Sequence, residues 1–143
     1  MIRWWQHALA VVAFLSVIVA VQWAQRQPVV LESSDWSKSG QRGQPVRELV
    51  IVNRLRGDCK AIVDAEIIDS QTTRHRMSPV IRNPPLEIGR VSVVNDFPIP
   101  FAASWGPAKI QVRRTYHCWP FYELLPIERP TRTLPFEIVP EKP

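Results

Sequence analysis

The feature that most constrains this chain is an almost uninterrupted apolar run near its N-terminus, residues 8–24, which contains no charged residue. Trp4 and Trp5 precede the run, and Trp23 lies near its end. In a helix that rises about 1.5 Å per residue, Trp4 and Trp23 lie about 28 Å apart, close to the ~30 Å hydrocarbon core of a bilayer. Indole rings favour the headgroup level. We therefore expect a transmembrane anchor over residues 1–25, with Trp4, Trp5 and Trp23 at the membrane interfaces and a short cytoplasmic N-terminal tail.

A cleaved secretory signal is the alternative interpretation, because such a signal also combines a short basic start with an apolar middle. Signal peptidase requires small residues at positions −1 and −3 of the cleavage site. Cleavage after Ala20 would place Ile18 at position −3, and cleavage after Ala24 would place Gln22 there. Both placements are unfavourable, so the sequence favours an uncleaved signal-anchor.

The part of the chain that follows the anchor suits one small all-β domain. Roughly 115 residues remain, enough for one core. The chain has 14 prolines against 5 glycines, which favours short strands and rigid connections over long helices. A first short strand and a polar stalk or loop are expected within residues 26–46, a β-sandwich within 47–139 and an exposed tail at 140–143. The strands of the sandwich are expected at 47–54, 59–69, 77–82, 89–95, 108–118 and 134–139.

The chain has only two cysteines, Cys59 and Cys118, and each lies in a segment of alternating apolar and polar residues. This period of two is typical of strands, and both cysteines share the inward face with their apolar neighbours. A disulfide across the sandwich core would fit this pattern and would close a loop of about 60 residues, stabilising the domain by about 4 kcal/mol. Two buried free thiols are the alternative, because cysteine is among the most buried residue types.

The orientation of the anchor depends on which observation is weighted more heavily. Lys and Arg near the anchor are slightly more numerous on its C-terminal side, at Arg26, Lys38 and Arg42, than at Arg3 on its N-terminal side, which favours a cytoplasmic domain. A disulfide favours the opposite, because disulfides persist outside the cytosol. We predict a single-pass protein of the bacterial inner membrane with its C-terminal domain in the periplasm.

Two resemblances follow from the second cysteine and its surroundings. The Tyr116-His117-Cys118 segment resembles the Tyr-x-Cys of immunoglobulin-like domains, which implies a two-sheet sandwich with a disulfide between the sheets. The wider pattern resembles that of small membrane-anchored β-sandwich proteins of tailed phages and their bacterial hosts. The residues that carry this second resemblance are Cys59, Ile68-Asp69, Gly106-Pro107-Ala108, Arg114, Tyr116, Cys118 and Pro120. It implies no known activity.

The sequence offers no pattern that points to catalysis, to a metal or to a cofactor. The histidines and cysteines have none of the spacings of a zinc site. Asp64 and Glu66 share a strand face, as an acid–base pair would, but solvated strand charges are far more common. The net charge of +5 is spread over scattered arginines, so we expect contact with the lipid bilayer and no nucleic-acid partner. Because no pattern of catalytic residues is present, the sequence predicts a protein that is not an enzyme.

Just after Cys118, large apolar side chains crowd between prolines, at Trp119, Phe121, Tyr122, Leu124 and Leu125. A loop that closes the end of the sandwich and an aromatic docking patch for an envelope protein both fit this segment, since Trp and Tyr often anchor interfaces. We expect a non-enzymatic protein that binds a partner or supports an envelope assembly. The alternative is a phage-type envelope effector of lysis or superinfection exclusion.

Overall fold

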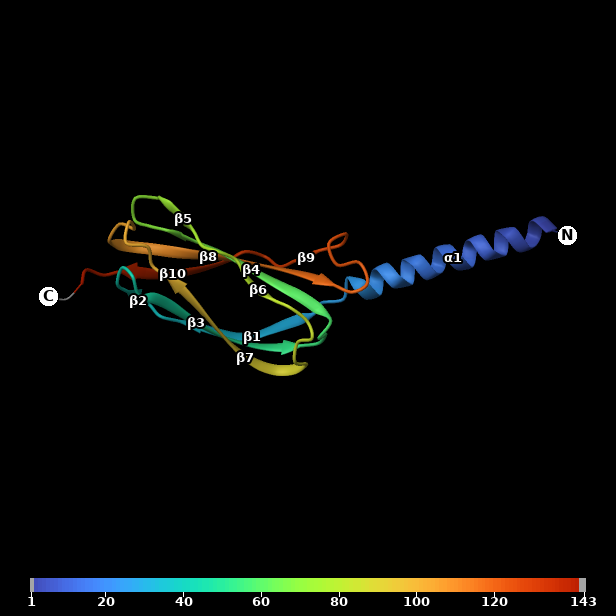
Figure 1. The fold of residues 1–143 in the computed structure, drawn as a ribbon, viewed down its shortest axis with the longest axis horizontal. Helices are drawn as coiled ribbons and strands as arrows, with labels where there is room; N and C mark the ends of the chain where they lie inside the picture. The colour runs from blue at the N-terminus through green and yellow to red at the C-terminus, as the bar shows by residue number, and fades with distance from the viewer. Residues whose placement is uncertain (1, 142–143) are drawn as a thin grey trace.

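The computed structural model describes residues 2–141 and consists of one helix and a mostly β domain (Figure 1). The helix α1 (Ile2–Ala24) extends from one end of the elongated domain, and the last described residues lie at the opposite end (Figure 1). The segment Trp4–Trp23 is long and apolar enough to cross a membrane, and none of it is buried against the domain. The expected N-terminal apolar helix is confirmed.

The smaller sheet has three antiparallel strands. Its spatial order is β1 (Val29–Trp36), β3 (Pro45–Arg54) and β7 (Gly89–Pro98). Every second residue of β3 is buried between the sheets, which is the period of two that predicted this strand. Two of these inward residues, Glu48 and Arg54, are charged.

The larger sheet has seven strands and faces the smaller one. Along its main path the order is β2 (Ser39–Gly40), β10 (Arg132–Ile138), β8 (Gly106–Cys118), β4 (Cys59–Ile68) and β5 (Arg74–Arg76). The short strand β6 (Val80–Arg82) also pairs with β4, and β9 (Ile127–Glu128) pairs with β8. The prediction of a two-sheet β domain is confirmed.

Apolar side chains between the sheets form two clusters. The cluster far from the helix is the larger and is built on Ile67, Ile110 and Leu134, each at most 1% exposed. The cluster near the helix includes Val50 and both cysteines. Glu48, on the strand between Val46 of one cluster and Val50 of the other, brings a carboxylate into the space between the sheets.

The polar segment that follows the first expected strand belongs to the domain. β1 continues to Trp36 and pairs with β3, with a register shift between Leu31 and Ser33. β2 then adds a short parallel pair to β10. Residues 33–36 and 39–40, within the segment expected to be a stalk or a loop, are thus strand residues.

The disulfide between Cys59 and Cys118 is present, but it does not join the two sheets as expected. β4 and β8 are antiparallel neighbours in the larger sheet, and Cys59 lies directly opposite Cys118 in their register. Both cysteines do face inward, with exposures of 1% and 3%. The expectation of an inter-sheet bridge was wrong because an inward position does not specify whether the partner strand lies alongside or across the core.

Candidate docking site at the helix-proximal end

The end of the domain from which α1 extends combines three loops. These are the β3–β4 connection at 55–58, the segment 83–88 before β7, and the β8–β9 loop at 119–126. Figure 1 shows the β8–β9 loop beside the end of α1. We call this surface the helix-proximal rim and define it by its exposed apolar residues Leu55, Ile88, Trp119, Tyr122 and Leu124.

Arg56 connects the rim to the helix. Its Nη1 donates to the carbonyl oxygen of Trp23 at 3.3 Å, and its guanidinium lies 4.5 Å from the centre of the Trp23 ring. Its Nη2 donates to the carbonyl oxygen of Trp119 at 2.9 Å. Asp58 holds the same guanidinium through contacts of 2.7 Å and 3.0 Å. The side chain of Arg56 is only 10% exposed, so it acts as a clamp between helix and domain.

The rings of Trp23 and Trp119 complete this contact. They pack edge to face with their centres 6.3 Å apart, an arrangement that aromatic pairs favour. The chain between helix and domain is also held, because the carbonyl oxygen of Pro28 accepts hydrogen bonds from the N–H groups of Leu55 and Arg56 at 2.8 Å and 3.3 Å. The start of the domain therefore lies directly against the end of the helix.

A tight loop geometry supports the clamp. Gly57 lies between Arg56 and Asp58, and a Cβ atom at this position would lie 2.4 Å from the carbonyl oxygen of Leu86. The N–H of Leu86 donates to the carbonyl oxygen of Gly57 at 2.9 Å. The turn at 56–58 is thus packed against the loop before β7, and only glycine fits there without a shift of the backbone.

The predicted aromatic patch lies on this rim but divides into two groups. Leu124, Trp119 and Tyr122 are 81%, 55% and 38% exposed. Phe121 and Leu125 are half-buried. The loop is fixed to the end of β8 by the N–H of Tyr122, which donates to the carbonyl oxygen of Cys118 at 2.8 Å. Both expected roles of this segment, closing the sandwich end and presenting apolar side chains, are consistent with these positions.

Sequence reasoning missed Leu55, Arg56 and Ile88 as parts of this surface. A signal for Arg56 was present, because Arg56 lies three residues before Cys59 while Trp119 directly follows Cys118. Once the two cysteines are paired, their neighbours in the sequence must lie close together. No signal in the sequence placed Leu55 or Ile88 on the same surface, because this depends on how the loops of the two sheets meet.

The tryptophans expected at the membrane interfaces lie at the two ends of α1. Trp4 and Trp5 pack edge to face at one end, with ring centres 5.6 Å apart, and Trp23 contacts Trp119 at the other end.

At the end of the domain far from the helix, in the connection before β8, Phe101 and Trp105 are 75% and 54% exposed. This distal pair of aromatic residues was not singled out from the sequence.

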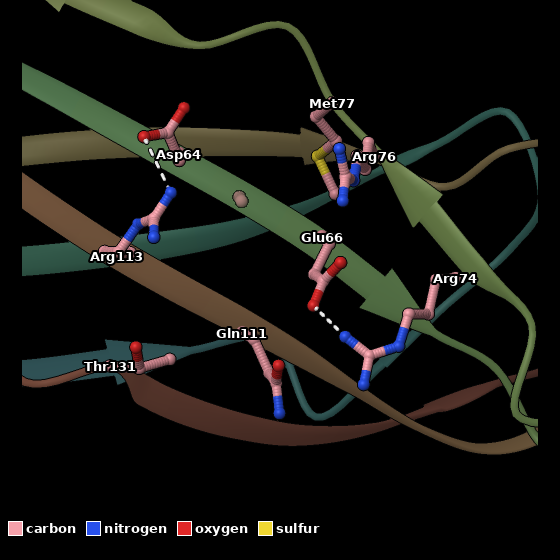
Figure 2. Close-up of a pocket in the computed structure, with 9 residues that line it drawn as sticks. Asp64, Glu66, Arg74, Arg76, Met77, Gln111, Arg113 and Thr131 are labelled. Carbon is pink, nitrogen blue, oxygen red and sulfur yellow. Dashed lines mark hydrogen bonds and ion pairs between the residues drawn. The ribbon is translucent and has the colours of Figure 1, made fainter.

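A hollow of 380 Å³ lies on the outer face of the larger sheet (Figure 2). Its carboxylates are those of Asp64 and Glu66, the residues that resemble an acid–base pair in the sequence. Glu66 accepts a contact of 2.8 Å from Arg74, and Asp64 lies 3.8 Å from Arg113. Each carboxylate thus faces its own arginine in an exposed ion pair, which is the ordinary arrangement of charges on a solvated strand face.

Asp69 organises the turn at the far end of β4. Its carboxylate accepts hydrogen bonds from the N–H groups of Gln71, Thr73 and Ser104 at 2.9–3.0 Å, and His75 Nε2 lies 3.1 Å away. Burial alone would raise the pKa of Asp69, but these hydrogen bonds outweigh it and hold the pKa well below its usual range. These hydrogen bonds join the turn after β4 to the connection before β8, so this cluster stabilises the fold.

Within residues 2–141 no three His, Cys, Asp or Glu side chains come together in a way that could hold a metal ion. The chain matches no model of a known protein family, and no curated protein matches it. The fold and the helix-proximal rim therefore provide the basis for a functional proposal.

Proposed function

We propose that this is a non-enzymatic single-pass membrane protein whose β domain binds a neighbouring membrane protein through the helix-proximal rim. The observation that carries the proposal is the Arg56 clamp. It fixes Trp119 beside Trp23, so that exposed apolar loops of the domain lie at the level where the helix leaves the membrane. A partner bound there would be one that also lies at the membrane surface.

The exposure of the rim supports this assignment. Trp23, Ile88, Trp119 and Tyr122 line a wide hollow of 750 Å³ between the helix end and the domain. Leu124, two residues after Tyr122, has 81% of its surface exposed. Aromatic and aliphatic side chains that surround a hollow are typical anchors of protein interfaces, with arginine as a frequent companion.

The location that goes with this function is the periplasmic side of a bacterial inner membrane. The Cys59–Cys118 disulfide supports an oxidising compartment. The strand order supports an immunoglobulin-like domain, because β1-β3-β7 corresponds to strands A-B-E and β10-β8-β4 to strands G-F-C. In this correspondence the disulfide joins strands C and F of one sheet and replaces the inter-sheet B–F bridge of antibody domains.

Site-specific photo-crosslinking in cells tests the proposal. Benzoylphenylalanine at Leu124 probes the rim, and the same group at Phe101, which is similarly exposed at 75%, is the matched control at the distal end. We expect a discrete protein adduct from position 124 that stays with the membrane after an alkaline wash and is identified by mass spectrometry as a membrane protein. The adduct should weaken when Arg56→Ala is added.

Two results would overturn the proposal. One is a protein adduct from position 101 alone, which would move the binding surface to the distal end. The other is a lipid adduct alone at position 124, which would make the rim a contact with the bilayer.

A further inference from the structure

Between the two sheets, beside the core cluster nearer the helix, lies a cavity of 40 Å³ that the function proposed above does not use. Its wall is largely apolar, but three arginines from three strands reach it: Arg54 at the end of β3, Arg82 at the end of β6 and Arg114 on β8. Asn95 and Tyr116 also line it. Three cations around a small, partly buried space need negative charge nearby.

The described part of the chain supplies one carboxylate to this region, and it is already shared. Glu48, fully buried, accepts a contact of 2.8 Å from Arg114 and one of 3.5 Å from Arg132. Asn95 Nδ2 donates to the same carboxylate at 3.0 Å. Neither Arg54 nor Arg82 forms an ion pair with any residue between 2 and 141. Positive charge therefore exceeds negative charge between the sheets.

Arg54 is the residue that most needs a further partner. It is only 8% exposed, and its Nη1 donates to the carbonyl oxygen of Glu87 at 2.8 Å. Its Nε is buried without a hydrogen-bond partner in the described chain. Buried polar groups are normally satisfied, and a buried cation is normally paired. A water molecule would satisfy the N–H group but would leave the charge uncompensated.

The electrostatics of the neighbouring groups agree with this excess of positive charge. Burial lowers the pKa of Arg82, and the charges of Arg54 and Arg114 lower it further. Burial raises the pKa of Tyr116, although the surrounding arginines oppose this effect. The positive fields of the arginines thus converge on one place, and an anion there would relieve their mutual repulsion.

The size of the cavity limits the ligand. A water molecule needs about 10–15 Å³ of such space, so 40 Å³ accommodates one small ion with a water molecule and excludes a nucleotide base. Guanidinium groups bind oxyanions especially well, because two N–H donors match two oxygen atoms.

We propose that this cavity is a binding site for a phosphate-type oxyanion, held by Arg54 and Arg82 with Arg114 behind them. The site lies in the half of the domain next to the helix, since Arg54 directly precedes Leu55 and Arg56 of the rim. Both free phosphate and the phosphate of an anionic lipid headgroup have the chemistry that the site recognises.

The test measures thermal unfolding of the full chain in dodecyl maltoside, a detergent without phosphate. In one arm, phosphate replaces chloride at constant ionic strength; in the other, phosphatidylglycerol is added to the micelles without free phosphate. We expect a saturable rise in Tm of about 5–10 °C at a hundredfold excess over the dissociation constant. A rise in the first arm alone identifies a free anion as the ligand, and a rise in the second arm identifies the lipid phosphate.

Arg54→Met should abolish the phosphate-dependent rise, because it removes the buried unpaired donor while keeping an apolar stem. Arg82→Gln, at a half-buried position, should weaken the rise and decides the question if Arg54→Met does not fold. Arg76→Gln is the matched control, since it removes the same charge from an exposed position on β5. The proposal is overturned if Tm does not rise in either arm. It is also overturned if the rise for Arg82→Gln is as large as the rise for the wild type and for the control Arg76→Gln.

Discussion

Replacing Arg56 with alanine should release the helix from the domain. Two contacts of Arg56 cross from domain to helix: the hydrogen bond to the Trp23 carbonyl oxygen and the packing of the guanidinium on the Trp23 ring. The first is worth about 1 kcal/mol and the second about 0.5–1 kcal/mol. Their loss, about 1.5–2 kcal/mol, lowers the ratio of docked to undocked molecules roughly 10- to 30-fold. The Trp23–Trp119 ring contact is left in place by this substitution.

Distance measurements by pulsed electron paramagnetic resonance detect this release. Spin labels at Leu9 on the helix and Phe101 at the distal end report on the angle between helix and domain, and both positions are exposed, at 66% and 75%. Cys59 and Cys118 stay oxidised and are not labelled. In a lipid nanodisc the wild type should give one narrow distance distribution, and Arg56→Ala should give a broad one.

Two further variants separate the clamp from a general loss of charge. Arg56→Lys keeps the positive charge over the Trp23 ring but cannot contact Asp58 and both carbonyl groups together, so an intermediate width is expected. Arg90→Ala removes an exposed arginine that pairs with Glu32 at 2.7 Å and should leave the distribution narrow. If Arg56→Ala is as narrow as the wild type, the short segment 25–28 fixes the helix and the reasoning about the clamp is wrong.

Three other predictions concern stability. Replacing Cys59 and Cys118 together with alanine should lower the free energy of unfolding by about 4 kcal/mol, because the disulfide closes a loop with a sequence separation of 59. Mass spectrometry of protein alkylated without reductant should first show the linked peptide, and two alkylated thiols would contradict the prediction. The carboxylate of Asp69 has a lower pKa in the folded than in the unfolded chain, so its contribution is present above about pH 4 and is lost as the pH falls below that value. Asp69→Asn should therefore lower the free energy of unfolding by about 2 kcal/mol at pH 7. It should also make Tm fall less steeply as the pH is lowered below about 4. An unchanged fall of Tm with acid would refute this. Gly57→Ala should lower the free energy of unfolding in urea by about 1–3 kcal/mol, because its Cβ would lie 2.4 Å from the Leu86 carbonyl oxygen. An unchanged urea midpoint would show that the loop before β7 moves aside without cost.

The strands that could be predicted from the sequence are those with one buried and one exposed face. β4 and β8 alternate over most of their length, and inward residues such as Ala61, Ile67, Ile110 and Val112 are buried. The second half of β1 could not be predicted because it is an edge strand. Ser33, Ser34 and Asp35 contact solvent on this edge, so their polarity resembles that of a loop.

The pairing of strands was harder to predict than their positions. The inward face of Cys59 fits a partner across the core as well as a partner alongside it. The useful signal was that Cys59 begins its strand and Cys118 ends its own, because these two ends meet when antiparallel neighbours pair in full register. The rim was predictable only in its β8–β9 loop, where several large apolar residues lie close together in the sequence. Leu55 and Ile88 belong to short connections that lack such a cluster.

The position of the disulfide gives it a role in holding the helix as well as in stability. Arg56 and Asp58 lie just before Cys59, and Trp119 lies just after Cys118. The disulfide therefore fixes, relative to one another, the two chain segments that grip the helix end. Since Arg56 also donates to the Trp119 carbonyl oxygen, the covalent and hydrogen-bonded links between these segments are adjacent.

Reduction of the disulfide should therefore loosen the helix before the domain unfolds. β4 and β8 pair over ten register positions, so most of the sheet persists when only the covalent link at its end is removed. With nitroxide labels attached through unnatural amino acids at Leu9 and Phe101, mild reductant should broaden the distance distribution while far-UV circular dichroism still reports strand structure. Broadening that occurs only together with loss of the strand signal would mean that the disulfide stabilises the whole domain and has no separate effect on the helix contact.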